Sequence, residues 1–445
     1  MASGSSSTPA SAPAGLLPLT KGFEFELFIP WRWNADRNGV VEIPMPENIS
    51  ADVRDGCVVV AYQQRPKLGA DNMMNRMKVR AYAQQQCDLL IYDLLTQNGI
   101  DVNDPRGISD PSHPSAPVPD DSHRNADKTN MPEYYRWLIK RDPTIYDPVT
   151  GDWNNDGEPY HVHDVELISP VMLARSQGSN DEVVKVLTIM KENFACFTPQ
   201  SCGLHIHIAQ GLVPFDAVQL RKIAALLYMV EGMYTRLHPT WRHVDDFNHV
   251  SMRESNLALG MSSQTANNLG IDAANVFEEA SFEDELSPID CVTACSTLMR
   301  SNTPQAVQKL MKTDWRAAYD FTNVIVPRKP TIEFRQAAGT LNELWILHWS
   351  NILVQTVDLA RSAPESLLLS VLAPLFATVE NGSPDVYSCD RFLREQLRLG
   401  NAADYIQRTT PEQRSNPTAS ARQQAFRGRQ DLNRQLGPGI LPPVD

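Results

Sequence analysis

The sequence predicts an α+β fold, in which helices cover one face of a β-sheet whose other face is polar. Several segments carry apolar residues at helical spacing and begin or end at recognisable cap residues. Four short segments alternate apolar and polar residues, as a strand does when its two faces differ. They are Phe23-Glu24-Phe25-Glu26, Asp164-Val165-Glu166-Leu167-Ile168, Leu204-His205-Ile206-His207-Ile208 and Ile332-Glu333-Phe334-Arg335.

The polar residues of these four segments are almost entirely Glu, His and Arg. Because side chains at i and i+2 share one face of a strand, each segment would present its polar pair on one side only. Four such strands in one sheet would form a wall of carboxylates and imidazoles backed by a hydrophobic core. Two divalent cations and a polyphosphate require such a wall, so a nucleotide-dependent enzyme is the working hypothesis.

Each pair also has an ordinary structural explanation. Glu24 and Glu26 could lie on a solvated strand face, and either histidine could be a buried core residue. The Glu333–Arg335 pair could be a surface ion pair worth roughly 0–1 kcal/mol. Recurrence of one pattern in four places is what favours a functional site.

The first 18 or so residues are rich in Ser, Pro and Ala, so structure should begin near Lys21. Residues 81–95 predict an amphipathic helix, and Gly99 is a plausible helix stop. The segment from Asp101 to Asn130 is dense in Pro, Asp and Ser, which predicts a long loop in which His113 and His123 are solvated.

Two further helices are predicted at 181–193 and 216–237, the second with Asp216 as its N-cap, and they should cover the apolar side of the sheet. Residues 254–315 show no strand pattern and are interpreted as an insertion. Within it, Thr303 followed by Pro304 predicts a capped helix.

After Arg335, a capping box from Thr340 to Glu343 predicts a helix over 344–361. The chain beyond about Gly400 is rich in Arg, Gln and Asn and has few large apolar residues, which predicts a mobile tail.

The overall composition limits the function classes. Forty basic and fifty-three acidic residues give a formal charge of −13, which argues against nucleic acid or an anionic membrane as the main partner. No apolar run is long enough to span a membrane, and the N-terminus lacks the basic region of a secretory signal. Seven irregularly spaced cysteines favour a reducing compartment, so a soluble cytoplasmic protein is expected.

A zinc site is the competing interpretation of the histidine segment, since Cys202, His205 and His207 lie close together with Cys196 nearby. Cys202 and His205 would point to opposite faces of a continuous strand, so zinc binding would require a bend at Gly203. The sequence contains no P-loop, no dinucleotide-binding glycine motif, no nucleophile elbow and no H-E-x-x-H motif.

Ordered islands of this sequence resemble the amidoligase family, a branch of the carboxylate-amine ligases that are similar to glutamine synthetase and glutamate-cysteine ligase. The resemblance spans roughly residues 21–361. It rests on Phe23-Glu24-Phe25-Glu26, Trp137 with Asp142, Val165-Glu166-Leu167-Ile168-Ser169-Pro170, Cys202-Gly203-Leu204-His205-Ile206-His207, and Thr331-Ile332-Glu333-Phe334-Arg335-Gln336 with Gly339-Thr340.

The resemblance implies a curved, mostly antiparallel sheet of glutamine synthetase-like type, with helices on its outer face and the active site on its concave side. It also implies two Mg²⁺ ions and ATP. Glu26 and Glu166 would bind the metal nearer the substrate, and Glu24, His205 and Glu333 the metal on the nucleotide phosphates. His207 would contact an ATP phosphate, and Arg335 would stabilise the transferring phosphoryl group, which makes Arg335, Glu333 and Glu166 the expected catalytic residues.

By the same resemblance, a substrate carboxylate would attack the γ-phosphate and an amine would then displace phosphate from the acyl phosphate. The expected partners are therefore small-molecule or peptide carboxylates and amines, and the oligomeric state is left open. A hydrolase that needs no nucleotide and a non-catalytic scaffold are the alternatives.

Four segments are expected along the chain: a disordered tail (1–20), a catalytic domain (21–361) with insertions near 97–133 and 254–315, a helical extension (362–400) and a mostly flexible tail (401–445). The sequence departs from the family at Asp142-Pro143-Thr144, where a small hydroxyl residue usually follows the aspartate. Three more residues, Glu231, Arg242 and Asn323, fall near further polar positions of the family. Glu231 lies in a predicted helix and is expected on its solvated face.

Overall fold

A computed structural model gives the fold of the chain. It describes residues 16–33, 40–41, 49–54, 57–62, 65–66, 73–105, 134–142, 144–145, 161–243, 251–258, 290–313, 316–380 and 387–415. The segment that contains His113 and His123 lies outside these ranges, as does most of the predicted 254–315 insertion. None of the described helices combines the length and apolar composition needed to cross a bilayer.

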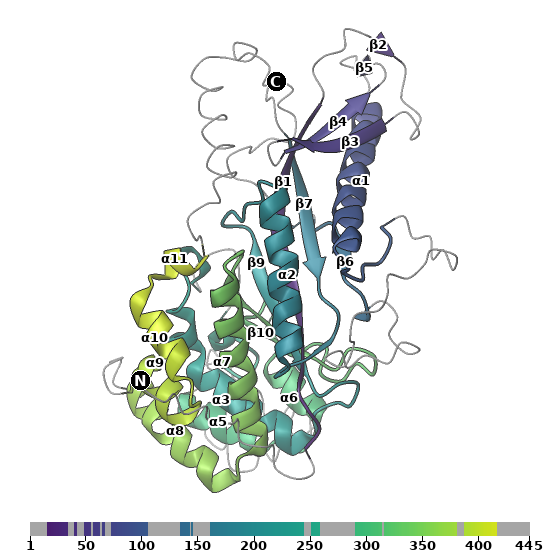
Figure 1. The fold of residues 1–445 in the computed structure, drawn as a ribbon. Coiled ribbons are helices and arrows are strands. Elements are labelled where there is room, and N and C mark those ends of the chain that lie inside the picture. Colours follow the sequence, from purple (N-terminus) through teal and green to yellow (C-terminus); the bar gives the residue numbers. More distant parts are fainter. Residues whose placement is uncertain are drawn as a thin grey trace, which may run out of the picture.

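In the described part of the chain, a nine-stranded sheet is built around one long strand, β1 (Thr20–Trp33). One edge of β1 pairs with β9 (Gly203–Ala209), and β9 pairs in turn with β11 (Ile332–Ala338) and β11 with β10 (Tyr319–Asp320). The other edge pairs with β7 (His161–Ile168), which is followed by β6 (Leu138–Lys140). These pairings are antiparallel, so the α+β class and the antiparallel sheet are confirmed (Figure 1).

Shorter strands extend this sheet. β8 (Met172–Leu173) pairs with the first residues of β1, and β4 (Cys57–Tyr62) pairs in parallel with its last residues. β3 (Ile49–Arg54) is antiparallel to β4. A separate ribbon joins β2 (Val40–Val41) to β5 (Arg65–Pro66).

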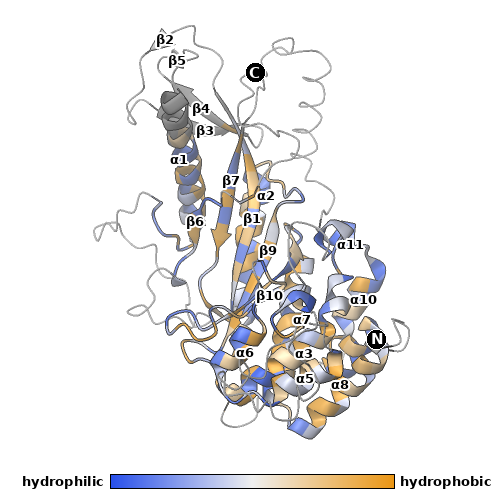
Figure 2. Ribbon diagram, turned by 180° about the vertical axis from the view of Figure 1, so that it is seen from behind, coloured by the Kyte–Doolittle hydropathy of each residue, from blue (hydrophilic) through white to orange (hydrophobic). Residues whose placement is uncertain are grey.

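Helices cover the apolar face of the sheet. In Figure 1, α2 (Gln177–Asn193) and α7 (Glu343–Ser362) lie in front of the strands, and α1 (Met73–Gln97) lies beside β6 and β7. α3 (Ala217–Thr235) packs against α7, α5 (Cys291–Met299) and α6 (Pro304–Leu310). Figure 2 shows the apolar colouring concentrated in this helical part and in the strands. The core side chains of the four predicted strands, among them Phe23, Leu167, Ile206 and Phe334, are fully buried there.

The C-terminal part is helical. α8 (Glu365–Glu380) follows α7, and α9 (Cys389–Arg391) continues into a π-helical turn (Phe392–Gln396). α10 (Gly400–Arg408) and α11 (Pro411–Ser415) then form where the sequence predicted a mobile tail. These two short helices contain few large apolar residues. The composition of this segment therefore did not predict them.

Local signals located several helix ends correctly, although α1 begins eight residues before the predicted start at 81. Asp216 caps α3 in a capping box with Gln219, Thr303 caps α6 with Pro304 in its first turn, and Gly99 adopts a φ of 75° after α1. The predicted capping box from Thr340 to Glu343 is wrong. Asn342 is the N-cap of α7 and accepts from the amide of Trp345, whereas the Thr340 hydroxyl donates to the carbonyl of Arg414.

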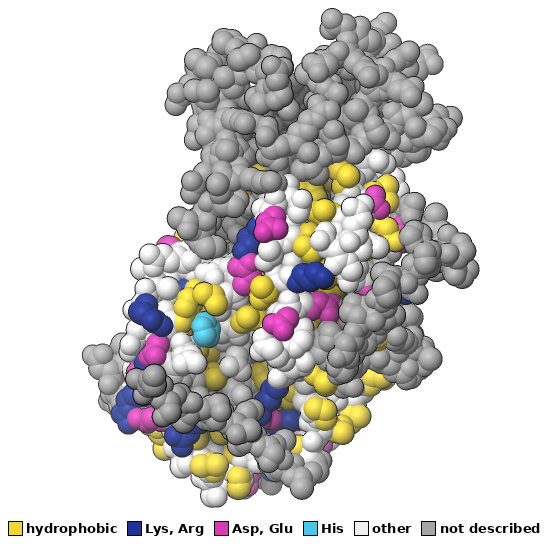
Figure 3. Space-filling view, viewed as in Figure 1, with side chains coloured by type: hydrophobic (Ala, Val, Ile, Leu, Met, Phe, Trp, Pro, Cys, Tyr) yellow, Lys and Arg dark blue, Asp and Glu magenta, His cyan; other side chains and the backbone are white. Residues whose placement is uncertain are grey.

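The helix-covered surface carries mixed charges. Figure 3 shows acidic and basic side chains interspersed among hydrophobic ones on this face, over the helices.

Candidate active site

The strand register places the polar residues of the four predicted segments on one face of the sheet. Glu24 lies directly opposite His205, Glu26 opposite Glu166, and His207 opposite Glu333. Directly opposed residues of neighbouring strands share a face, and so do residues two apart in one strand. The face opposite the helices is therefore lined by the carboxylates and imidazoles that the alternation predicted.

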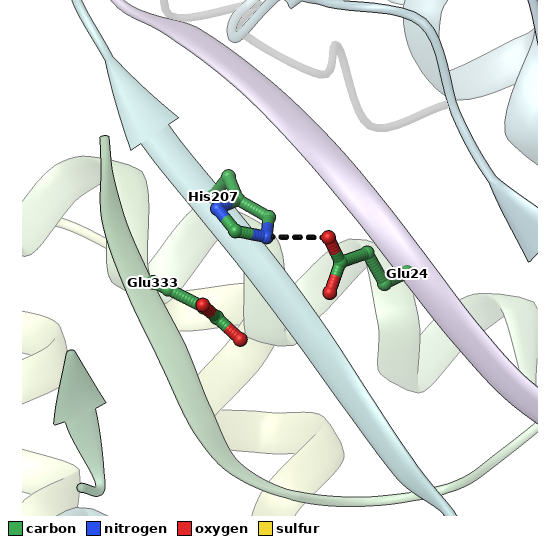
Figure 4. Close-up of side chains that lie close together, drawn as sticks. All are labelled: Glu24, His207 and Glu333. Carbon is green, nitrogen blue, oxygen red and sulfur yellow. Dashed lines mark hydrogen bonds and ion pairs between the residues drawn. The ribbon is translucent and has the colours of Figure 1, made fainter. Parts of the chain in front are cut away.

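Glu24, His207 and Glu333 converge at one point of this face. Each contributes a ligand atom, and these atoms lie within 4.8 Å of one another. Figure 4 shows the three side chains pointing toward each other from β1, β9 and β11. The Nε2 atom of His207 lies 2.9 Å from Oε1 of Glu24, and its Nδ1 atom lies 3.2 Å from the Thr331 hydroxyl.

His205 lies between the carboxylates. Its Nδ1 atom is 3.4 Å from Glu24 and 3.5 Å from Glu333, and its Nε2 atom is 3.4 Å from Glu26. The resemblance suggested His205 as a ligand together with Glu24 and Glu333. The structure places both histidines within reach of this carboxylate pair.

The charges in the cluster are strongly coupled. Burial raises the pKa of Glu24, but the imidazoles of His207 and His205 outweigh it and hold that pKa below its usual range. The pKa of Glu333 is lowered in the same way, by both imidazoles and Arg335 against the effect of burial. Burial lowers the pKa of His205, yet Glu26 and the other carboxylates raise it above its usual value overall.

Glu166 behaves differently from the other carboxylates. Burial and the negative charges of Glu24 and Glu26 raise its pKa to about 7, and Asp142 adds to this effect. In the protein without bound cations, the positive charge near Glu26 and Glu166 is thus too small to balance the negative charge of the two carboxylates.

A β-bulge shapes the β11 side of the site. The register between β9 and β11 shifts between Phe334 and Ala337, so Arg335 and Gln336 together lie opposite His205. The Arg335 guanidinium bonds Glu333 on the polar face. Gln336 is fully buried and donates to the Thr235 hydroxyl of α3, on the opposite face.

Two glycines allow the strands to approach one another at this point. A Cβ atom on Gly203 would lie 2.8 Å from Nε2 of His205 and 3.0 Å from Nη2 of Arg242. A Cβ atom on Gly339 would lie 2.6 Å from Cβ of Cys202 and 3.0 Å from its carbonyl carbon. A side chain at Gly203 would therefore displace the ends of the His205 and Arg242 side chains.

A pocket adjoins the Glu24 end of the cluster. It is lined by Glu24 and His207 of the cluster and, among other residues, by Tyr134, Leu212 and Lys329. The Lys329 ammonium lies 3.7 Å from Glu24 and 5.7 Å from the centre of the Tyr134 ring. A cation thus lies between the acidic cluster and the pocket.

At the Glu166 end of the polar face, basic side chains lie at the edge of the sheet and aromatic side chains lie next to them. Lys140 is exposed and lies directly opposite Glu166 in the β6–β7 register. The next residue, Arg141, bonds both oxygens of the fully buried Asp164 at 3.1 and 3.2 Å. Phe28 and Phe197 stack beyond this point.

The structure changes one sequence expectation about a polar residue and locates two further candidates. Glu231 is not on a solvated helix face, because it is 2% exposed and accepts from the amide of Met252 and the hydroxyl of Ser251. Arg242 is also buried, close to Gly203 of the site. Asn323 lies in the turn that follows β10.

The zinc interpretation finds no support in the described residues. Their one cluster with metal-ligand geometry contains no cysteine. Cys202 packs with Phe28, Ile145 and Val162, and burial raises the pKa of its thiol well above the usual value. A thiol in this environment is a poor metal ligand.

Asp142 lies where the sequence departs from the family pattern. Its carboxylate accepts a hydrogen bond from the backbone amide of Thr144 at 2.8 Å. The side chain of Asp142 therefore stabilises its own turn. Its charge still acts on Glu166, as the raised pKa of that residue shows.

Comparison with known proteins identifies a family. Residues 18–356 match the model of a family described as "Putative amidoligase enzyme". No curated protein and no solved structure matches the chain. The matched region includes all four polar strands and ends within α7. The chain therefore belongs to the amidoligase family, whose members are ligase-type enzymes.

Proposed function

We propose that this protein is an ATP- and Mg²⁺-dependent ligase that joins a carboxylate to an amine through an acyl phosphate. One observation carries the proposal: four glutamates and two histidines from adjacent strands share one face of the sheet, next to a pocket that Lys329 helps to line. A sheet face serving only the fold would not need this concentration of like charges, which is unfavourable without cations.

The residues present fit divalent cations. Glu24 and Glu333 offer carboxylate oxygens, which suit Mg²⁺ or Mn²⁺, and an imidazole nitrogen from His207 or His205 lies close enough to add a further ligand. Glu26 and Glu166 face each other directly and would hold a second cation. The raised pKa of Glu166 is the effect expected where a cation normally offsets carboxylate repulsion. Bound Mg²⁺ would neutralise phosphate charge and orient the phosphoryl group.

The nucleotide is placed in the pocket beside Glu24. Apolar side chains such as Leu212 and Ile168 suit a base, while Lys329, Thr331 and His207 lie where phosphates would pass toward the acidic cluster. This arrangement assigns His207 both to the cation cluster and to the phosphate path.

The carboxylate substrate is placed at the Glu26–Glu166 end. Lys140 and Arg141 provide positive charge there, and Asp164 holds the Arg141 guanidinium in place. A carboxylate approaching from this side would meet the γ-phosphate over the centre of the sheet.

In the proposed reaction, a carboxylate oxygen attacks the γ-phosphorus and the bond to the β,γ-bridging oxygen breaks, which releases ADP. The amine nitrogen then attacks the acyl carbon, the bond from that carbon to the phosphorylated oxygen breaks, phosphate departs with this former carboxylate oxygen, and the nitrogen loses a proton. Arg335 would neutralise developing charge on the transferring phosphoryl oxygens while its ion pair with Glu333 holds it in place.

Trapping with hydroxylamine tests this function without knowledge of the natural amine. Protein supplied with ATP, Mg²⁺, hydroxylamine and a panel of amino acids and peptides should form a hydroxamate and release ADP with at least one carboxylate. Arg335→Met should lower this rate by roughly 10²–10³-fold, whereas Arg328→Met, in an exposed turn nearby, should leave it unchanged. Cleavage of a substrate without nucleotide would instead identify a metal-dependent hydrolase, and no turnover with any carboxylate would contradict the ligase assignment.

A further inference from the structure

Arg242 is a buried cation beneath the proposed site. It ends a 3₁₀ turn (Thr240–Arg242) that follows α3, and its side chain is almost fully buried. Its Nη2 atom would be 3.0 Å from a Cβ atom on Gly203, the residue whose amide donates to Glu26. The guanidinium thus packs against the first residues of β9, next to His205.

The surroundings of Arg242 balance its charge only in part. None of the carboxylates in the described ranges lies within ion-pair distance of it, and its Nε atom has no hydrogen-bond partner there. Burial lowers its pKa to about 10, while the charge of Glu26 acts in the opposite direction, so the side chain is a cation at neutral pH. A buried guanidinium without an acidic partner is costly, and stability alone does not explain it.

The one hydrogen bond that Arg242 makes to β11 is at the bulge. Its Nη2 atom donates to the backbone carbonyl of Arg335 at 2.7 Å. Within the bulge, the amide of Arg335 donates to the carbonyl of Ala318, and its own carbonyl accepts from the Arg242 side chain. The same bulge directs the Arg335 side chain to the polar face and that of Gln336 to the helices.

We propose that Arg242 is a positioning residue of the active site. It fixes the Arg335 carbonyl in the bulge, which orients the Arg335 guanidinium over the cation cluster, and its charge partly balances Glu26. The expected effect on catalysis rests on the proposed ligase function, whereas the expected effect on the conformation of the bulge is independent of that function.

Two substitutions separate these roles. Arg242→Met removes the charge and the hydrogen bond, and Arg242→Lys keeps the charge and one donor. Arg236→Met, at an exposed arginine six residues earlier, is the matched control. Each variant is compared with the parent by backbone amide exchange over residues 333–338 and by the ATP-dependent hydroxamate assay.

In Arg242→Met we expect exchange at 333–338 to be about tenfold faster, with β1 and β7 unchanged. We also expect kcat to fall by roughly 10²-fold while the KM for ATP stays within about threefold, because Arg335 acts on the transition state. Arg242→Lys should recover at least part of kcat. Arg236→Met should match the parent in both measurements.

Parent-like exchange at 333–338 in Arg242→Met would overturn the inference, as would a KM increase with unchanged kcat. If the parent forms no hydroxamate, the proposed function fails and amide exchange alone decides the role of Arg242. If Arg242→Met does not fold, Arg242→Lys carries the test, because lysine keeps the charge but lacks the rigid, planar guanidinium. Faster exchange at 333–338 than in the parent would then support the inference, and parent-like exchange would overturn it.

Discussion

At the scale of single residues, the site depends on backbones that approach more closely than a side chain permits. Gly339 follows β11, and its amide donates to the carbonyl of Cys202 at 2.8 Å. Any Cβ atom at this position would press on the Cβ atom and the backbone carbonyl of Cys202, which is fully buried. Gly232 offers a contrast, since it lies exposed on α3 and an added Cβ atom there would meet nothing within 4 Å.

Gly339→Ala should therefore lower the free energy of unfolding by about 1–3 kcal/mol through overpacking. Gly232→Ala should raise it by about 0.5–1 kcal/mol, because alanine favours a helix interior over glycine. Urea denaturation of both variants and the parent measures these changes. Equal effects of the two substitutions would show that the strand approach at Gly339 is not tight.

Glu166 makes stability depend on pH when divalent cations are removed. Its pKa is about 7 in the folded protein against 4.5 ordinarily, so the folded state holds this proton more tightly than the unfolded state. The contribution to stability is present at low pH and is lost as pH rises from about 4.5 to about 7.

Glu166→Gln removes this titration. In EDTA, the melting temperature of the parent should therefore fall relative to that of Glu166→Gln between pH 5 and pH 7.5. Melting curves of both proteins at the two pH values provide the measurement. A difference that stays constant with pH would mean that Glu166 is not protonated in the folded protein.

At the scale of elements, alternation and cap residues were informative because they are local. The four polar strands, the cap of α3 at Asp216 and the cap of α6 at Thr303 follow from residues within a few positions of one another. Alternation also implies a shared face within each strand. The register of the strand pairs then aligns these polar faces into one face across β1, β7, β9 and β11.

Other features depend on contacts between distant segments, which no local pattern contains. The bulge at Arg335 is held by Arg242, 93 residues away, and Glu231 is buried because residues 251 and 252 cover it. The hydroxyl of Thr340 was expected to cap α7 but bonds the carbonyl of Arg414 in α11. The convergence of His207 with Glu24 and Glu333 likewise requires the register of three strands.

At the scale of the whole molecule, the C-terminal helices are attached to the segments that flank the site. The buried guanidinium of Arg414, in α11, donates to the carbonyl of Leu237 at 2.8 Å and lies 5.1 Å from the Trp345 ring centre. Its backbone carbonyl accepts from Thr340, which follows β11. Leu237 precedes the turn that carries Arg242, so α11 joins two segments close to the bulge.

Arg414→Ala should lower the free energy of unfolding by about 2–3 kcal/mol, because it leaves buried carbonyls without their charged donor. Arg408→Ala, at an exposed position of α10, should change it by less than about 0.5 kcal/mol. Thermal and urea unfolding of both variants and the parent would measure these changes in the free energy of unfolding. A parent-like stability of Arg414→Ala would show that α11 is not an integral part of the fold.

The most direct test of the central claim is a thermal-shift titration of the purified protein with Mg·ATP, Mg·ADP and Mg²⁺ alone. Ligand that binds only the folded state adds RT ln(1 + [L]/Kd), so Mg·ATP should raise the melting temperature by several degrees. Glu24→Gln and Glu333→Gln should lose most of this gain, whereas Glu192→Gln, at an exposed position of α2, should retain it. Absence of any shift in the parent, or equal shifts in all four proteins, would contradict a nucleotide and cation site on this face of the sheet.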